Sequence, residues 1–339
     1  MDKLPILPTT VVGSHGKAGW WFEGVKAWEE RRWGPYDLDE MMDDAADTAI
    51  RDMTRAGIDV ITDGEVRRLD GYVDSYYAVI TGIEPVEQAR RAGPWGYDQQ
   101  TRYRAVGRIE APQGGLGIVK EFEYLKAHTD KPVKATCAGP LTFGSRIFPG
   151  AEYGNAFEVA ERFAKVINDE LKALEAAGAD WIQIDEPARG QGTGSQMARM
   201  FNLATEGVKA KLGYHICFGN RFGRARFKRH YSDYFPGLLE AKCDQFVLEF
   251  AAREMYEIEK WKEWDDGREL GCGVIDVKSF YPETAEDVAE RIRVALKYVR
   301  PEKLVLNPDC GFGWSPRGMC NGKLEALAGG AAIVRKEIG

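Results

Sequence analysis

Regular alternation of short apolar strands with helices limits the possible fold more than any other feature of this chain. The strands predicted from residue 133 onward cover 133–138, 181–184, 214–217, 245–249, 271–277 and 304–307. The helices predicted around them cover 156–177, 196–212, 234–242, 254–264 and 283–299. These strands are continuous apolar runs, as is typical of strands buried on both faces. The alternation therefore indicates a parallel α/β sheet.

Two earlier β-branched segments, 9–14 and 59–65, bring the predicted number of strands to eight. Eight βα units suggest a closed (β/α)8 TIM barrel, and a doubly wound open sheet is the alternative, since strand count does not prove closure. Residues 83–112 look like an irregular insertion with a hairpin between the second and third strands. No repeat or linker divides the 339 residues, so 1–339 is predicted to be one domain.

Composition excludes several classes of protein. The net charge of −7 argues against general nucleic-acid binding. No apolar run approaches the roughly 20 residues that a membrane span needs, and residues 1–5 do not resemble a signal peptide. The six cysteines are too few for a disulfide framework in a chain of this length and fit a reducing compartment. We therefore expect a cytoplasmic protein without a nucleic-acid or membrane partner.

Two residues at the end of one predicted strand point to a metal. His215 and Cys217 are two positions apart, so their side chains project from the same face of the strand. An imidazole and a thiolate side by side supply half of a tetrahedral zinc site. Taken alone, the pair is better explained as a buried, inert cysteine beside a hydrogen-bonded histidine than as half of a zinc site.

Residues at the ends of two later strands strengthen the metal hypothesis. Glu249 lies in an apolar strand, where an unpaired carboxylate would be costly, and Cys310 follows the last strand. Because the carboxyl ends of barrel strands face one mouth, these residues should converge with the earlier pair. Two thiolates, an imidazole and a carboxylate suit zinc better than calcium or magnesium. The predicted Zn2+ ligands are His215, Cys217, Glu249 and Cys310.

Other polar residues and cysteines have simpler explanations. Ser14, Asp276 and Asp309 each precede a predicted helix, where capping explains them as well as a role in a site does. The remaining cysteines are interpreted as packing residues, because buried cysteine is common. They are Cys137, Cys243, Cys272 and Cys320.

Taken in order, these segments resemble the C-terminal catalytic domain of cobalamin-independent methionine synthase, and the likeness covers nearly all of the chain. The matching pieces are Leu-Pro-Thr-Thr-Val-Val-Gly-Ser at 7–14, Asp-Gly-Glu at 63–65, Gly-Pro-Leu-Thr at 139–142, Gln-Ile-Asp-Glu-Pro at 183–187, His-Ile-Cys at 215–217, Glu249, Gly-Val-Ile-Asp at 273–276 and Asn-Pro-Asp-Cys-Gly at 307–311. Because the pieces follow one another in the family's order, the resemblance is highly specific.

The resemblance implies a (β/α)8 barrel and zinc bound by the four predicted ligands. It also implies that the thiol of a homocysteine-like amino acid joins the metal and attacks a methyl group in line. Ser14 would hold the carboxylate of this substrate, while Glu65 and Asp185 would hold its ammonium group. A zwitterion needs such a division, with anions at one end and donors at the other.

The sequence departs from the family pattern on the side of the methyl donor. A tryptophan that stacks on folate in the family is replaced by Arg146, and the catalytic histidine after Gly-Val-x-Asp is replaced by Lys278. Lys278 is therefore either catalytic or the ion-pair partner of a nearby carboxylate such as Asp276. The basic stretch 221–230 is either a solvated loop or a docking place for an anionic donor or carrier protein. We expect no counterpart of the family's second, N-terminal barrel.

The main functional hypothesis is a zinc-dependent methyltransferase that makes methionine from homocysteine. Its donor is a methylated corrinoid, free or protein-bound, or 5-methyltetrahydrofolate; an ordinary lysine is a poor acid for the folate reaction, which favours the corrinoid. The alternative is a zinc alkyltransferase or lyase acting on another thiol, as epoxyalkane:coenzyme M transferases do, although Glu65 and Asp185 would repel a sulfonate. A third hypothesis is a non-catalytic thiol- or metal-binding protein, against which the intact ligand set argues.

Overall fold

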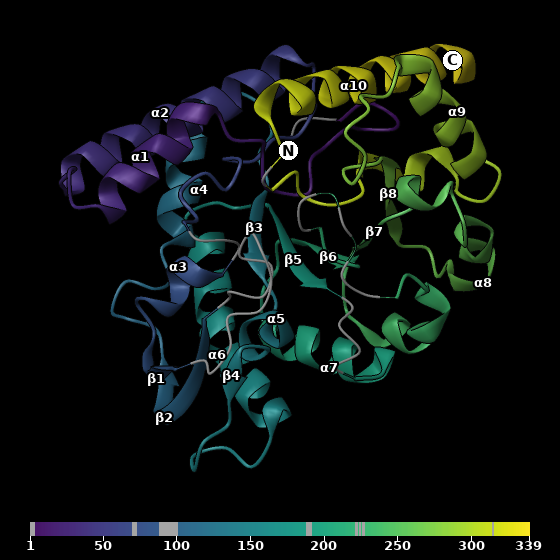
Figure 1. Cartoon of the computed structure of the whole chain (residues 1–339). Coiled ribbons are helices and arrows are strands. Elements are labelled where there is room, and N and C mark those ends of the chain that lie inside the picture. Colours follow the sequence, from purple (N-terminus) through teal and green to yellow (C-terminus); the bar gives the residue numbers. More distant parts are fainter. Residues whose placement is uncertain are drawn as a thin grey trace.

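The structure is a computed structural model that describes residues 4–69, 73–87, 101–187, 192–220, 223, 225, 228–313 and 315–339. Its centre is a six-stranded parallel sheet, and Figure 1 shows helices around the outside of these strands. The prediction of a parallel α/β fold is confirmed. The strands, in sheet order, are β3 (Ala135–Ala138), β5 (Trp181–Pro187), β6 (Lys211–Cys217), β7 (Gln245–Leu248), β8 (Glu269–Ile275) and β9 (Leu304–Pro308).

Strand register brings the polar motifs to one edge of the sheet. Asp185 on β5 pairs with His215 on β6, and Pro187 pairs with Cys217 at the carboxyl ends of the same strands. Strands β3, β7 and β9 are buried along their whole length, and β6 and β8 are buried after their first residue. Burial of both faces explains why these strands are continuous apolar runs.

The first two predicted strands, 9–14 and 59–65, pair with their neighbours only through isolated parallel bridges. One bridge joins the first segment to β9, one joins the two segments, and one joins the second segment to the residues before β3. The bridges are Thr9–Leu306, Thr10–Val60 and Ile61–Val133.

Side-chain hydrogen bonds replace part of the expected backbone pairing in these two segments. The carboxylate of Asp59 accepts from the backbone N–H of Thr9 at 2.8 Å, and the Thr9 hydroxyl accepts from the N–H of Asp59 at 3.0 Å. Gly64 and Glu65 then adopt φ values of 76° and 52°, outside the β region. The extended pairing therefore stops after one or two residues on each side.

A second, smaller sheet forms the predicted insertion. Strands β1 (Thr81–Val86) and β2 (Arg102–Glu110) pair antiparallel, and β4 (Ile147–Phe148) pairs parallel with β2. The prediction of a hairpin in this region is confirmed, and residues 88–100 between its two strands lie outside the described residues.

Local chemistry explains where the main helices begin. In α2, Pro35 occupies the first helical position, and the carboxylate of Asp37 accepts from the N–H of Gly34 at 2.7 Å. In α6, the Asn155 side chain accepts from the first free N–H groups. The helices are α1 (Gly19–Glu29), α2 (Pro35–Arg55), α3 (Asp74–Tyr77), α4 (Ile118–Ala127), α5 (Pro140–Gly144), α6 (Ala156–Ala176), α7 (Gly194–Ala204), α8 (Trp261–Trp264), α9 (Ala285–Ala295) and α10 (Arg317–Ile338).

The predicted helix 196–212 ends at Ala204, and β6 begins at Lys211 within that range. Two further predicted helices, 234–242 and 254–264, are wrong in extent. Pro236, which lacks an N–H donor, lies in the first, and Glu254, Met255 and Glu257 have positive φ in the second. Both segments therefore break into short 3₁₀ turns, and only α8 is α-helical there. The turns in this part of the chain are Tyr231–Asp233, Gly237–Glu240, Ala251–Arg253 and Ile258–Lys260. Across the described ranges, no helix combines the length and apolarity that a membrane crossing needs.

Candidate active site

Three of the four predicted metal ligands come together at the carboxyl edge of the sheet. His215 and Cys217 belong to β6, and Cys310 lies just after β9. One ligand atom from each residue lies within 4.8 Å of the other two. His215 and Cys217 are buried, whereas Cys310 is partly exposed. The cluster can therefore supply three protein ligands to a metal ion.

The orientation of His215 leaves one ring nitrogen for a metal. Its Nδ1 lies 2.9 Å from the carbonyl oxygen of Val247 on β7. Because a carbonyl can only accept, Nδ1 carries the hydrogen, and Nε2 of the neutral ring keeps a lone pair. Nε2 is buried and has no hydrogen-bond partner among the described residues. A histidine held by a carbonyl through one nitrogen, with the other turned toward two thiols, has the form of a metal ligand.

Burial and the neighbouring ionisable groups shift the pKa values of the residues in the cluster. Burial acts to lower the pKa of His215, but Cys310 together with the Asp185 and Glu249 carboxylates raises it overall. The adjacent thiol of Cys217, together with burial, raises the pKa of Cys310 well above its usual value. The Cys310 thiol therefore favours its protonated form, and a bound metal would reverse that preference.

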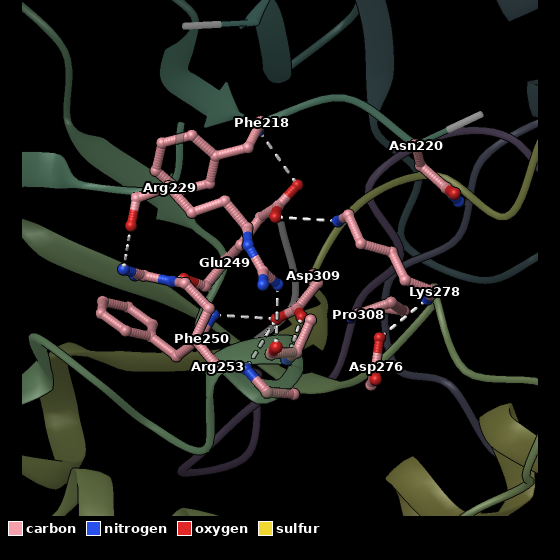
Figure 2. A network of polar contacts seen from close by, with 12 residues as sticks. Phe218, Asn220, Arg229, Glu249, Phe250, Arg253, Asp276, Lys278, Pro308 and Asp309 are labelled. Atoms are coloured by element: carbon pink, nitrogen blue, oxygen red, sulfur yellow. Dashed lines mark hydrogen bonds and ion pairs between the residues drawn. The ribbon is translucent and has the colours of Figure 1, made fainter. Parts of the chain in front are cut away.

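The fourth predicted ligand, Glu249, is bonded to protein groups (Figure 2). Its Oε2 lies 2.8 Å from Nζ of Lys278, and its Oε1 accepts from the backbone N–H of Phe218 at 3.2 Å. The side chains of Glu249 and Lys278 are 0% and 7% exposed. The buried ammonium group of Lys278 therefore offsets the cost of burying the Glu249 carboxylate. That cost is the reason why Glu249 stands out in an apolar strand of the sequence.

Lys278 does form an ion pair, but its partner is Glu249 and not Asp276. Asp276 accepts a hydrogen bond from the backbone N–H of Lys278, at 2.7 Å. Burial acts against the charge of Lys278, yet Glu249, Cys310 and Asp309 around it raise its pKa above the ordinary value. A lysine in this setting holds its proton more tightly than a free one, which makes it a poor general acid.

Two charged residues that the sequence did not assign to the site hold the end of β7 (Figure 2). Asp309 accepts from the N–H groups of Phe250 and Ala251 at 2.8 and 2.9 Å, and Arg253 donates to the carbonyl of Glu249 at 3.0 Å. Asp309 thus caps a turn, although not that of the helix that follows it in the sequence. Arg253 lies in a segment without helical or strand periodicity, so no sequence pattern marks it.

Glu65 and Asp185 are both buried and both held by groups on neighbouring strands. The Glu65 carboxylate accepts from the hydroxyl of Thr136 at 2.8 Å and lies 2.7 Å from Arg68 Nη1. The Asp185 carboxylate accepts from the side-chain amide of Gln183 at 2.6 Å. Thr136 on β3 and Gln183 on β5 are register partners, so the two carboxylates approach the same part of the sheet. The φ of 52° at Glu65 is costly for a residue with a side chain and is typical of functional sites.

Ser14 lies against the loop that carries Cys310. Its hydroxyl accepts from the N–H of Gly313 at 2.9 Å, and its carbonyl accepts from that of Phe312 at 2.9 Å. A Cβ at Gly311 would collide with the Ser14 hydroxyl, which explains the glycine there. The N-cap of the following helix α1 is Ala18, so Ser14 does not cap that helix.

Besides Lys278, two features distinguish this chain on the side of the methyl donor. Arg146 is buried and forms an ion pair with Asp74, so it presents neither an aromatic face nor a free charge. The basic stretch 221–230 lies partly outside the described residues. Within its described part, Arg229 donates to the carbonyl of Ala252 at 3.0 Å.

The cysteines interpreted as packing residues are buried, which confirms that interpretation. Burial raises the pKa of the thiols of Cys137 and Cys272 above the usual value, so they are poor nucleophiles. All six cysteines of the chain lie in the described ranges, and all are free thiols.

Comparison with known proteins supports the resemblance noted in the sequence. Residues 7–328 match the family described as "Cobalamin-independent synthase, Catalytic domain". The methionine synthase of Saccharolobus solfataricus is 36% identical over 343 residues, covering 100% of this chain and 98% of that protein. The methionine synthase of Sulfurisphaera tokodaii is 34% identical over 342 residues, covering 100% of this chain and 95% of that protein.

Solved structures agree with these matches. A B12-independent methionine synthase from Shewanella sp. W3-18-1, solved in complex with selenomethionine, has a TM-score of 0.83 at 29% identity, covering 98% of this chain and 99% of that chain. A structure from Listeria monocytogenes, with a TM-score of 0.70 at 19% identity and 98% of this chain covered, shows the same fold. On these matches over nearly its whole length, the chain belongs to the cobalamin-independent methionine synthase family, whose members are enzymes.

Proposed function

We propose that this chain is a zinc-dependent methyltransferase that moves a methyl group to the thiol of homocysteine and so forms methionine. The observation that carries the proposal is the cluster of His215, Cys217 and Cys310 around a buried imidazole nitrogen without a partner among the described residues. Family membership supports the reaction, because the similar proteins carry the name methionine synthase.

Zinc is the metal that these residues fit. Two thiols and an imidazole are the ligand types that zinc prefers, and three protein ligands leave a position for substrate. Glu249 is proposed as a displaceable fourth ligand, because it directly follows β7, whose Val247 carbonyl holds the His215 ring. Lys278 is then a positioning residue, since its ion pair holds the Glu249 carboxylate. Bound zinc would favour the thiolate form of the substrate near neutral pH.

The amino-acid end of homocysteine is assigned to three other residues. Glu65 and Asp185 would hold the ammonium group and Ser14 the carboxylate. Thr136 and Gln183, which hold the two carboxylates, are register partners on adjacent strands, and this favours the assignment of both carboxylates to one group. The position of Ser14 beside the loop that carries Cys310 favours its assignment to the other end. The Shewanella relative was solved with selenomethionine, an amino acid of the same class as the proposed product. A thiol with a sulfonate group would meet like charge here, which disfavours the coenzyme M alternative.

In the proposed step, the substrate sulfur attacks the methyl carbon in line with the bond to the donor. The sulfur–carbon bond forms as the methyl–donor bond breaks, and the electron pair of the broken bond remains on the donor. The side chains of this chain contribute by holding both ends of homocysteine so that its sulfur faces the methyl group.

A methylated corrinoid is proposed as the donor in preference to 5-methyltetrahydrofolate. The folate leaving group needs a proton, and Lys278, the residue in the family's histidine position, is paired with Glu249 and has a raised pKa. A corrinoid needs no proton, because its cobalt takes the electron pair. Arg146 is paired with Asp74 and offers no surface on which a pterin could stack.

We also infer that the central strands close into one (β/α)8 barrel over residues 1–339. The three isolated bridges support closure, because they lead from β9 through segments 9–14 and 59–65 to the residues before β3. A cytoplasmic location is inferred from the free state of all six cysteines.

The decisive experiment incubates zinc-loaded protein with homocysteine and either methylcobalamin or methyltetrahydrofolate, and measures methionine. Methionine formed with at least one donor, and abolished in Cys217→Ser, is the expected result. A parallel reaction replaces homocysteine with coenzyme M, a sulfonate thiol. Alkylation of coenzyme M without methionine formation would replace the proposal with the alternative thiol alkyltransferase.

A further inference from the structure

A buried lysine lies beneath the proposed ammonium site. Lys134 immediately precedes β3 and is 1% exposed. Its Nζ donates to the carbonyl of Val11 at 2.6 Å and to the side-chain oxygen of Gln183 at 2.7 Å. It also lies 5.3 Å from the centre of the Trp181 ring. The lysine is therefore held at a defined position inside the sheet.

The contact with Lys134 decides which way the Gln183 amide points. An ammonium group can only donate, so the oxygen of the amide must face it. The amide nitrogen then faces the opposite way, where it donates to the carbonyl of Val12 at 2.8 Å and to the Asp185 carboxylate at 2.6 Å. Lys134, Gln183 and Asp185 thus form a directed chain of hydrogen bonds that ends on the carboxylate.

A packing role alone does not account for a lysine at this position. Burial lowers the pKa of Lys134 to about 7, while Asp185 and Glu65 act to raise it and Lys211 to lower it. The ammonium form is therefore costly here, and methionine would fill a similar volume without that cost. What methionine cannot supply is a donor that orients the Gln183 amide.

We propose that Lys134 is a positioning residue that orients Asp185 through Gln183 and thereby sets the affinity of the site for the substrate ammonium group. This inference rests on the proposed function, because Asp185 must bind the amino-acid end of homocysteine for the orientation to matter.

The test compares Lys134→Met with the matched control Lys211→Met. Lys211 also lies over the Trp181 ring, at 3.9 Å, but its Nζ pairs with Glu269 at 2.6 Å. With zinc-loaded protein, Lys134→Met should raise the dissociation constant and KM of homocysteine about fivefold to tenfold, with kcat and zinc content unchanged. Lys211→Met should leave homocysteine binding as in the wild type.

A double-mutant cycle separates action through Gln183 from a general loss of packing. In a Gln183→Met background, the further change Lys134→Met should weaken homocysteine binding by less than about twofold. Full additivity of the two changes, or equal effects of Lys134→Met and Lys211→Met, would overturn the proposal.

Gln183→Glu keeps the test valid where Lys134→Met does not fold. This variant retains a partner for Lys134 but turns a carboxylate oxygen toward Asp185, and should also weaken homocysteine binding; unchanged binding would contradict the proposal. Asp185→Asn separates the proposed substrate site from the positioning role of Lys134. If Asp185→Asn leaves homocysteine binding intact, the proposed substrate site fails; if only the Lys134 and Gln183 variants leave it intact, the positioning role alone fails.

Discussion

The two sides of the candidate active site satisfy their polar groups in opposite ways. On the side of β6 and β9, the Nε2 atom of His215 lies beside two thiols without a hydrogen-bond partner among the described residues. On the side of β3 and β5, Lys134, Gln183 and Asp185 are bonded to one another in sequence. The first side is therefore arranged to gain a ligand, and the second is arranged to hold one geometry.

The energetic consequence differs between the two sides. A buried polar group without a partner costs about 1–3 kcal/mol. On the side of β6 and β9, a cation bound to Nε2 of His215 would remove this cost. On the side of β3 and β5, hydrogen bonds satisfy the polar atoms of Gln183 and Asp185, and the remaining cost is that of burying the Lys134 ammonium group. Substitutions on the side of β6 and β9 should therefore abolish metal binding. Substitutions on the side of β3 and β5 should instead change the affinity for homocysteine gradually.

The largest effect is expected on the side of β6 and β9. Cys217→Ser and Cys310→Ser should each lose the one zinc ion that we expect per chain, and with it methionine formation, because a hydroxyl is a poor zinc ligand. Metal analysis of the purified proteins measures this. Cys243→Ser, which changes a cysteine outside the cluster, should retain zinc. Wild-type zinc content in both cluster variants would show that the metal lies elsewhere.

The next effect concerns the donor and depends on the Lys278–Glu249 ion pair. Methionine formation from a methylated corrinoid should exceed that from methyltetrahydrofolate by about 100-fold, since general-acid help to the folate is missing. Initial rates with both donors at matched concentrations test this. Rapid turnover with methyltetrahydrofolate that is lost in Lys278→Ala would instead identify Lys278 as the proton donor.

On the side of β3 and β5, we expect a graded effect on the affinity for homocysteine. Asp185→Asn should weaken homocysteine binding about tenfold or more, through loss of a charged hydrogen bond, with zinc retained. Glu65→Gln should weaken it less, because Arg68 already neutralises part of the Glu65 charge. Calorimetric titration of zinc-loaded variants gives both affinities. Equal affinity for homocysteine in wild type and both variants would remove an amino-acid substrate.

The smallest effect is a pH dependence of stability that arises from Lys134. Its pKa falls from 10.5 to about 7 on folding, so between these values the unfolded chain binds more protons than the native one. Stability from this group therefore rises with pH, by about 1 kcal/mol between pH 7 and pH 8. The free energy of unfolding of the wild type minus that of Lys134→Met, measured by denaturant titration, should increase accordingly. A difference that does not change with pH would contradict the lowered pKa.

The sequence by itself determined the fold class and the chemical types at the site. Buried parallel strands are apolar runs, and polar residues such as His215, Cys217 and Cys310 stand where those runs end. Both signals are local, since they depend on neighbouring residues and on spacing within one strand. The same local signals misjudged segments 234–242 and 254–264, where a proline and positive φ values interrupt an apolar pattern.

Tertiary structure alone decided which side chains became partners. Lys278 bonds to Glu249, which is 29 positions away, although Asp276 is its neighbour in sequence. Lys134 bonds to Gln183 across 49 positions, and Asp309 caps a turn 58 and 59 positions earlier. Such contacts are set by the order and register of parallel strands, which place distant residues side by side. No pattern within a single segment carries that information, because hydrogen bonds select partners by distance in space.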